Sequence, residues 1–212
     1  MRISLAVLFG FVLFQQADAK IISTAVGQVR DHIVTSREVQ INQALEQLLY
    51  PDKKTTTIKI LSDTDSPTFA KQVTAVLLEW VVHLEAGSMN VERATESELG
   101  AAEGKVKTGL SKLPAWKNLK VTTKEMQSAI QRKIQAKKFI RFRADSSVVP
   151  VSEVEAQRYY EANRIKFGDL PFDNFRTNIK GFLARQQVER RLKDWFEVLK
   201  AKYQVRNFLA EI

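Results

Sequence analysis

A lysine that follows two glycines is the first candidate for chemistry in this chain. Residues 100–106 read Gly-Ala-Ala-Glu-Gly-Lys-Val, which superficially matches the glycine-rich loops that cradle nucleotide phosphates. The stretch has one residue too few between its glycines, has no Ser or Thr after Lys105, and lies inside a helical pattern. We therefore expect no nucleotide to bind there.

The two histidines, His32 and His83, are the next candidates. A zinc site or a His-based catalytic triad needs further ligands or partners nearby. The chain has no cysteine, and no regular Asp or Glu spacing surrounds either histidine. We expect His83, between Val82 and Leu84, to be a partly buried helix residue and His32 to help form a turn. The sequence therefore predicts no metal site, no cofactor and no catalytic residue.

A basic segment and a tryptophan are the candidates for binding a polypeptide. Residues 132–143 contain no acid and six basic residues, with Phe139 and Phe142 lying off the apolar stripe of the expected helix. Such a face could hold an acidic, aromatic-rich unfolded segment, or it could be a solvated cationic face with both rings packed on a neighbouring helix. Trp116 lies in a loop and either contacts a ligand or plugs the core. The candidate binding residues are Trp116, Lys137, Lys138, Phe139, Arg141 and Phe142.

The N-terminus predicts export from the cytoplasm. Arg2 precedes an apolar run over residues 3–14, and Ala17-Asp18-Ala19 is a small-x-small cleavage site, the pattern of a secretory signal peptide. A retained anchor is the alternative, but the run is shorter than the roughly 20 residues a membrane span needs. We expect cleavage after Ala19. Without cysteine, the exported chain has no disulfide and no thiol to acylate.

Charge and composition limit the partners. The chain has 33 Lys and Arg against 24 Asp and Glu, a formal net charge of +9, and 44% hydrophobic residues. That hydrophobic content argues against wholesale disorder, and removal of residues 1–19 leaves 193 residues, enough for one core. A basic exported protein attracts acidic polypeptides, anionic lipid headgroups or nucleic acid. Export makes nucleic acid the least favoured, and we expect none to bind.

The first half of the chain predicts a hairpin followed by helices. Residues 21–34 are typical of a β-hairpin or an extended arm, and Thr35 with Glu38 has capping-box spacing for a helix over residues 36–49. Residues 55–61 are a candidate strand. Pro67 suits the first turn of a helix that is apolar on nearly every side and therefore central in the core, and we expect Gly87 to end it.

The second half predicts further helices and a returning strand. We expect helices over residues 91–112 and 122–143 with a turn around 114–116 between them, and a short helix capped by Ser152 and Glu155. Apolar residues from Phe172 onward recur at helical spacing for roughly 30 residues, about 45 Å. Residues 203–209 are expected to add a strand beside the N-terminal hairpin. The predicted fold class is mainly α, with a small β element formed by the N- and C-terminal segments.

A family resemblance rests mainly on residues 150–200. The motifs that carry it are Pro150-Val151-Ser152, Tyr159 to Asn163, Lys166-Phe167 and Leu170-Pro171-Phe172. This succession resembles the SurA, PpiD and PrsA group of extracytoplasmic folding factors, and residues 25–40 resemble the hairpin and first helix of the same group more weakly. In that group a parvulin prolyl isomerase module usually separates the two helices. Here only Gly168 and Asp169 lie between the corresponding motifs.

The resemblance covers essentially all of residues 20–212 and concerns the chaperone portion alone. It implies a SurA-like domain with an N-terminal lobe over about 20–150 and C-terminal helices over about 151–212. The implied function is that of an ATP-independent periplasmic chaperone, not an enzyme, which holds unfolded or partly folded exported polypeptides, outer-membrane proteins among them. The alternatives are an isomerase-family member with residual activity and an envelope structural adaptor. A homodimer stays open.

Overall fold

The computed structural model describes residues 23–51, 60, 64–89, 91, 93–111 and 113–210. The expected signal peptide over residues 1–19 lies outside these residues, as does nearly all of the candidate strand over 55–61. Within the described ranges, no helix combines the length and the apolar character needed to cross a bilayer.

A small sheet joins the two ends of the described chain. Strands β1 (Ala25–Val29) and β2 (His32–Thr35) form an antiparallel hairpin, and β3 (Arg206–Asn207) pairs antiparallel with the other edge of β1. The order is therefore β2-β1-β3. Gly27 pairs with Asn207, and a side chain at Gly27 would clash with the Arg206 carbonyl and Leu77. The predicted mainly α fold with a β element from both ends is confirmed.

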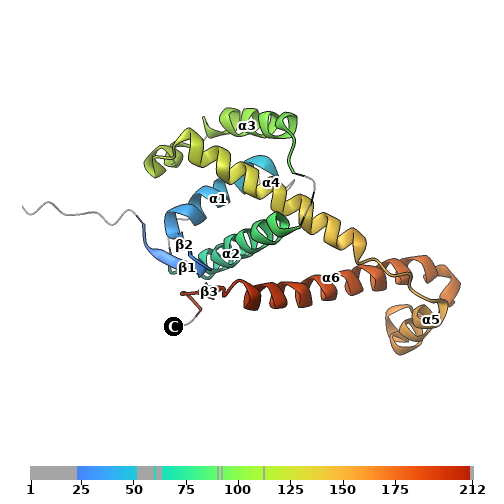
Figure 1. The fold of residues 1–212 in the computed structure, drawn as a ribbon. Coiled ribbons are helices and arrows are strands. Elements are labelled where there is room, and N and C mark those ends of the chain that lie inside the picture. The colour runs from blue at the N-terminus through green and yellow to red at the C-terminus, as the bar shows by residue number, and fades with distance from the viewer. Residues whose placement is uncertain are drawn as a thin grey trace, which may run out of the picture.

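Helix α2 (Pro67–Ser88) is the centre of the molecule (Figure 1). It contacts the sheet, α1 (Ser36–Leu49), α4 (Thr123–Ser146) and α6 (Arg176–Lys202), as expected for a helix that is apolar on nearly every side. Ser66 accepts a hydrogen bond from the Phe69 amide at its N-terminus, and Pro67 occupies the first turn. The helix runs one residue beyond Gly87, so the prediction that Gly87 ends it is wrong. The predicted bounds of α1 are confirmed.

Helices α3 (Glu96–Leu110) and α4 (Thr123–Ser146) complete the upper part of Figure 1. Each begins with a capping box, formed by Thr95 with Glu98 and by Thr122 with Glu125. In such a box the hydroxyl and the carboxylate satisfy two backbone amides that would otherwise have no partner. The turn predicted between the two helices is the 3-10 helix η1 (Pro114–Leu119).

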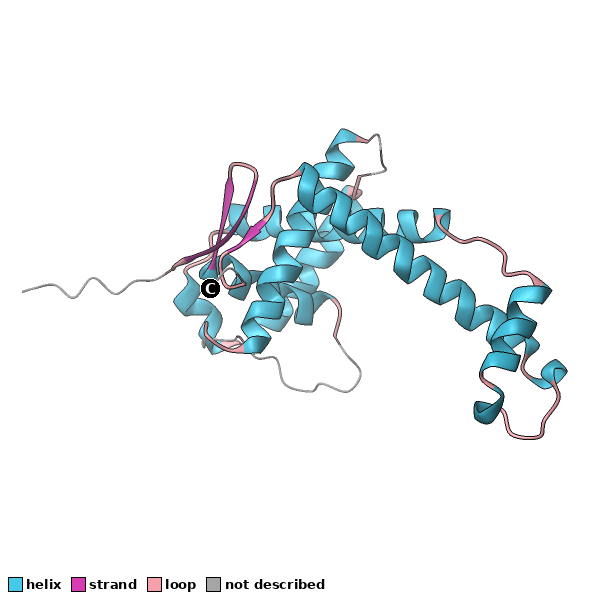
Figure 2. Cartoon of the chain, turned by 90° about the horizontal axis from the view of Figure 1, so that it is seen from below, coloured by secondary structure: helices cyan, strands magenta, loops and turns pink. Residues whose placement is uncertain are grey.

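The remaining helices form an extension that projects away from the first four helices and runs back to the sheet. Helix α5 (Glu153–Ala162) is followed by the 3-10 helices η2 (Arg164–Lys166) and η3 (Phe172–Asn174), and then by α6 (Arg176–Lys202). Figures 1 and 2 show α5 at the far end, with α6 running from it back to the sheet. The predicted capping box between Ser152 and Glu155 is present. We call residues 142–190 the arm and the other described residues the lobe.

The lobe and the arm have separate apolar cores. The C-terminal half of α6 closes the lobe, because Leu199 and Tyr203 pack with residues of the hairpin and α2 such as Phe69. A smaller core of Ala156, Tyr160 and Ile179 joins α5 to the first turns of α6. Helix α6 therefore belongs to both parts and attaches the arm to the lobe.

Candidate binding surface

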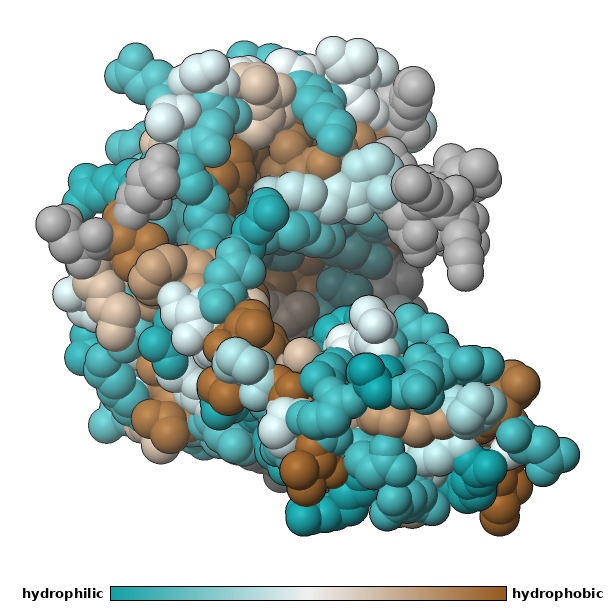
Figure 3. Space-filling model, turned by 90° about the vertical axis from the view of Figure 1, so that its right-hand side faces the viewer, coloured by the Kyte–Doolittle hydropathy of each residue, from teal (hydrophilic) through white to brown (hydrophobic). Residues whose placement is uncertain are grey.

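Exposed apolar side chains gather on the arm. Of the ten large apolar side chains that are exposed among the described residues, seven lie between residues 142 and 182. A soluble chain normally scatters such side chains singly, and their concentration marks a surface for interaction. Figure 3 faces the free end of the arm, where brown apolar patches interrupt the hydrophilic surface. The seven are Phe142, Val148, Val149, Val154, Ile165, Leu170 and Phe182.

A hollow of about 700 Å³ on the arm lies between α5 and residues 171–176. Its charged side chains largely satisfy one another: Arg176 pairs with Glu153 and with Asp173, and Lys180 pairs with the same Glu153. The pKa of Glu153 is lowered chiefly by the hydrogen bond from Lys180. Arg158 and Glu161 also line this hollow, so it carries charges of both signs and has no excess of positive charge with which to select an acidic ligand.

A second hollow of about 290 Å³ lies where the end of α4 meets α6. Ala144, Val148, Ala184 and Val188 supply an apolar lining, with Asp145, Arg185 and Glu189 at its edge. The Arg191 guanidinium donates a hydrogen bond to the Ser147 carbonyl at 2.8 Å and so ties α6 to the end of α4. This hollow has the size and lining for one apolar side chain.

A third hollow of about 370 Å³ lies between α5 and α6. Arg158 of α5 and Arg190 of α6 both line it, and neither makes an ion pair with any described residue. Glu155 also lines it, but its carboxylate accepts hydrogen bonds from the Ser152 hydroxyl and amide. Those two bonds are the main causes of its lowered pKa. The charge of Arg158 also contributes to that lowered pKa, so Glu155 partly offsets Arg158, and Arg190 is the cation of this hollow with no acidic partner among the described residues.

Phe139 is the clearest correction to the predicted binding residues. Its side chain is 0% exposed and packs edge-on against Trp195, with ring centroids 5.6 Å apart. The prediction that this ring is available to a client is wrong, because the ring fills the junction of α2, α4 and α6. Phe142, by contrast, is 54% exposed and stacks on Phe139.

The predicted lysines of α4 have acidic partners in the lobe. Lys137 lies 3.7 Å from a Glu46 oxygen and over the Tyr50 ring, while Lys138 donates to both carboxylate oxygens of Glu98. Arg141 is exposed, and no ion pair within the described residues engages it. A client-binding role for these residues stays a prediction, with Arg141 the best placed of them.

Trp116 is half-buried in η1 and packs against the core cluster of α1, α3 and α4. That position favours the alternative in which the Trp116 side chain packs into the core. Its surroundings belong to the lobe, so it does not share a surface with the apolar side chains of the arm.

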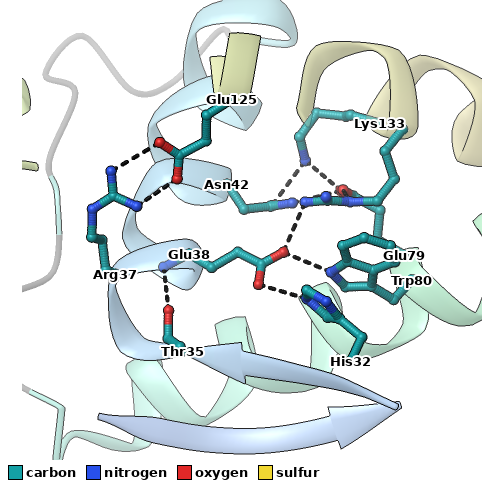
Figure 4. Close-up of polar contacts among 10 residues, drawn as sticks. His32, Thr35, Arg37, Glu38, Asn42, Glu79, Trp80, Glu125 and Lys133 are labelled. Carbon is teal, nitrogen blue, oxygen red and sulfur yellow. Dashed lines mark hydrogen bonds and ion pairs between the residues drawn. The ribbon is translucent and has the colours of Figure 1, made fainter. Parts of the chain in front are cut away.

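The first two cations of the basic segment are buried, not solvated. The Arg132 guanidinium donates to Glu79 at 2.9 Å. The Lys133 ammonium donates to Glu79 at 2.8 Å and to Asn42 at 2.9 Å (Figure 4), and it also donates to Glu46 at 2.9 Å. Burial alone would raise the pKa of Glu79, but the two cations hold it below its ordinary value. These five residues join α1, α2 and α4, so the cations are structural.

Glu38 belongs to the same cluster. Thr35 accepts the Glu38 amide as predicted, but the Glu38 carboxylate contacts Trp80 at 2.6 Å, His32 at 2.9 Å and Arg132 at 3.2 Å. The predicted capping box at this helix is therefore wrong, because stronger side-chain partners from β2, α2 and α4 claim the carboxylate (Figure 4).

The other candidates for chemistry also have structural positions. Gly100 and Gly104 lie inside α3, and the Lys105 ammonium donates to the Leu49 carbonyl at the end of α1. His32 stacks on the Trp80 ring at 3.9 Å between centroids. His83 is half-buried in α2, as predicted, and burial and the nearby Arg132 lower its pKa.

Comparisons with models of protein families, with curated proteins and with solved structures return no match for this chain.

Sequence reasoning missed most of the arm surface. Val148 and Val149 precede a proline, and Val154, Ile165 and Leu170 are single apolar residues among polar ones. Periodicity cannot find such residues, because they lie in loops or on the outer side of short helices. Proximity to the prolines at 150 and 171 was the only local signal.

Proposed function

We propose that this protein is an ATP-independent chaperone that holds unfolded or partly folded exported polypeptides. The observation that carries the proposal is the arm, an ordered extension that displays most of the exposed large apolar side chains beside hollows of side-chain size. The resemblance of residues 150–200 to SurA-type folding factors supports the same conclusion, and the proposed location is the periplasm.

The proposed mechanism is reversible coverage of a client's apolar segments. A lone apolar contact is weak, but each buried side chain contributes about 1.5 to 3 kcal/mol, so several contacts along the arm hold a segment while each remains exchangeable. The net charge of +9 attracts acidic segments and speeds encounter. No bond is made or broken, and no nucleotide takes part.

Aggregation suppression tests the proposal. The mature protein is mixed with one unfolded outer-membrane protein and one unfolded soluble protein, without nucleotide, and light scattering is followed. The test variant replaces Val148 and Val149 with Ser on the arm, and the control replaces the exposed Ile33 and Val198 of the lobe with Ser. We expect the wild-type protein and the control to suppress scattering, and the arm variant to suppress it several-fold less.

Two results would count against the proposal. If the wild-type protein suppresses neither client, the chain is not a general holding chaperone. If it binds one native protein saturably and no unfolded chain, it is an envelope adaptor instead. Equal loss in the arm and lobe variants would place client binding away from the arm.

A further inference from the structure

The hollow between α5 and α6 has two arginines and two glutamines in its lining. Gln186 and Gln187 line it together with the two arginines, and no hydrogen bond within the described residues engages either glutamine side chain. An amide side chain offers both donors and an acceptor. The hollow therefore combines unsatisfied amides with unpaired positive charges.

The hollow also has an apolar floor. Tyr159 and Leu183 are half-buried side chains that line it, and the Tyr159 ring is fixed from below by Phe167 and Phe182, at 6.3 and 5.4 Å between centroids. Burial of an aromatic ring against such a floor is favourable, and aromatic pairs prefer offset or edge-on geometry. An apolar or aromatic ligand group therefore finds an apolar surface within the same hollow as the two arginines.

From these features we infer that the α5–α6 hollow is a specific subsite for an unfolded segment in which an acidic side chain lies next to a large apolar or aromatic one. The carboxylate pairs with Arg158 and Arg190, the apolar side chain lies on Tyr159 and Leu183, and the glutamine amides take the segment's free backbone groups. This inference rests on the proposed function and names the client chemistry that the arm prefers.

The net charge of the chain argues against a second copy of it as the occupant, and the volume of the hollow argues against a folded surface. A second copy of this chain has the same net charge of +9 and would bring cations toward Arg158 and Arg190, which like-charge repulsion disfavours. A volume of about 370 Å³ is near the lower end of ligand pockets, so it accommodates one or two side chains of an extended segment and not a folded surface.

The neighbouring acids offset only part of the positive charge of the subsite, because Glu155 interacts with Arg158 but two cations face this one acid in the lining. Glu155 is committed to the α5 cap, and Glu161 accepts a hydrogen bond from Gln157 and does not line this hollow. Arginine is also the cation best suited to carboxylates, because its guanidinium offers a planar, two-pronged set of donors.

Fluorescence anisotropy with short labelled peptides tests the inference. All peptides have blocked ends, so the only carboxylate is a side chain. The first carries Phe-Asp in a Ser/Gly background, the second Phe-Asn, and the third separates Phe and Asp by eight residues. We expect the wild-type protein to bind the first about tenfold more tightly than the second or third at low salt, and this preference to shrink at 0.5 M salt because the pairing is exposed to screening.

The protein variants then locate the subsite. Arg158→Gln with Arg190→Gln should bind the Phe-Asp and Phe-Asn peptides equally. The matched control, Arg93→Gln with Lys117→Gln, removes the same charge from exposed positions on the lobe and should keep the tenfold preference. Melting curves of both variants should match the wild type, since all four side chains are exposed.

The outcomes separate this inference from the function it rests on. If the wild-type protein binds Phe-Asp and Phe-Asn equally, or the arginine variant keeps the preference, the subsite is refuted while aggregation suppression stands. If the control loses the preference as fully as the arginine variant, net charge and not the hollow selects the acid, which also refutes it. If aggregation suppression itself fails, the proposed function is refuted first.

Discussion

Replacement of Glu79 by Gln removes the centre of the buried charge cluster. The Glu79 carboxylate accepts hydrogen bonds from Arg132, Lys133 and Asn42 at 2.8 to 2.9 Å. In the variant, Arg132 keeps its ion pair with Glu38 and Lys133 keeps its ion pair with Glu46, so neither cation loses all of its acidic partners. Removal of one partner from a buried ion pair costs about 3 to 5 kcal/mol, and the remaining partners place the expected cost near the lower value.

Thermal unfolding measures this cost. At about 2 to 4 °C per kcal/mol for a chain of this size, a loss of about 3 kcal/mol lowers Tm by about 6 to 12 °C at pH 7. Glu153→Gln is the control, because it breaks exposed ion pairs on the arm and should leave Tm nearly unchanged. A Glu79→Gln variant that melts with the wild type would refute the reasoning that this cluster ties α1, α2 and α4 together.

The same pair of proteins has a predicted pH dependence. The pKa of Glu79 is lowered in the folded state: burial opposes this, but Lys133 and Arg132 outweigh burial. A carboxyl with a lowered folded pKa contributes stability that is complete above its unfolded pKa of about 4.5 and is lost as pH falls through the folded value. The difference in Tm between wild type and Glu79→Gln should therefore be constant from pH 6 to 7 and shrink below about pH 4.5. A constant difference down to pH 3 would contradict the assignment.

Two further predictions address the return of α6 and the absent isomerase module. Leu199→Ala should lower the free energy of unfolding in urea by about 2 to 5 kcal/mol, because the Leu199 side chain is only 2% exposed. Val198→Ala is the control and should leave that free energy unchanged, because Val198 is 65% exposed. Equal effects of the two changes would mean that α6 does not close the lobe. A proline-peptide assay of the purified protein should show no isomerisation rate above background, because only residues 168 and 169 separate the two arm motifs. Isomerase activity that follows the protein through purification would contradict this prediction.

The fold was more predictable from sequence than the binding surface, for physical reasons. Helices such as α1 and α5 carry their own start signals in capping residues, and α2 carries a pattern that only a central helix can satisfy. The partners of Glu38 and Arg132 could not be predicted, because they come from β2, α2 and α4, which are distant in sequence. The exposure of Phe142 and the burial of Phe139 could not be separated either, since both depend on where α6 returns.

The pairing of β1 with β3 sets an order of events for the export that we propose, in which the N-terminus crosses the membrane first. Gly27 meets Asn207 only when 180 further residues have followed it, so the edge of β1 stays unpaired until β3 has been made. Until then β1 has an open edge toward β3, and Phe69 and the rest of the α2 core lack the cover of Leu199 and Tyr203. Such distant contacts slow folding. Until β3 has formed, this chain is therefore an incompletely folded polypeptide with exposed apolar surface, the same kind of molecule that we propose the folded protein holds.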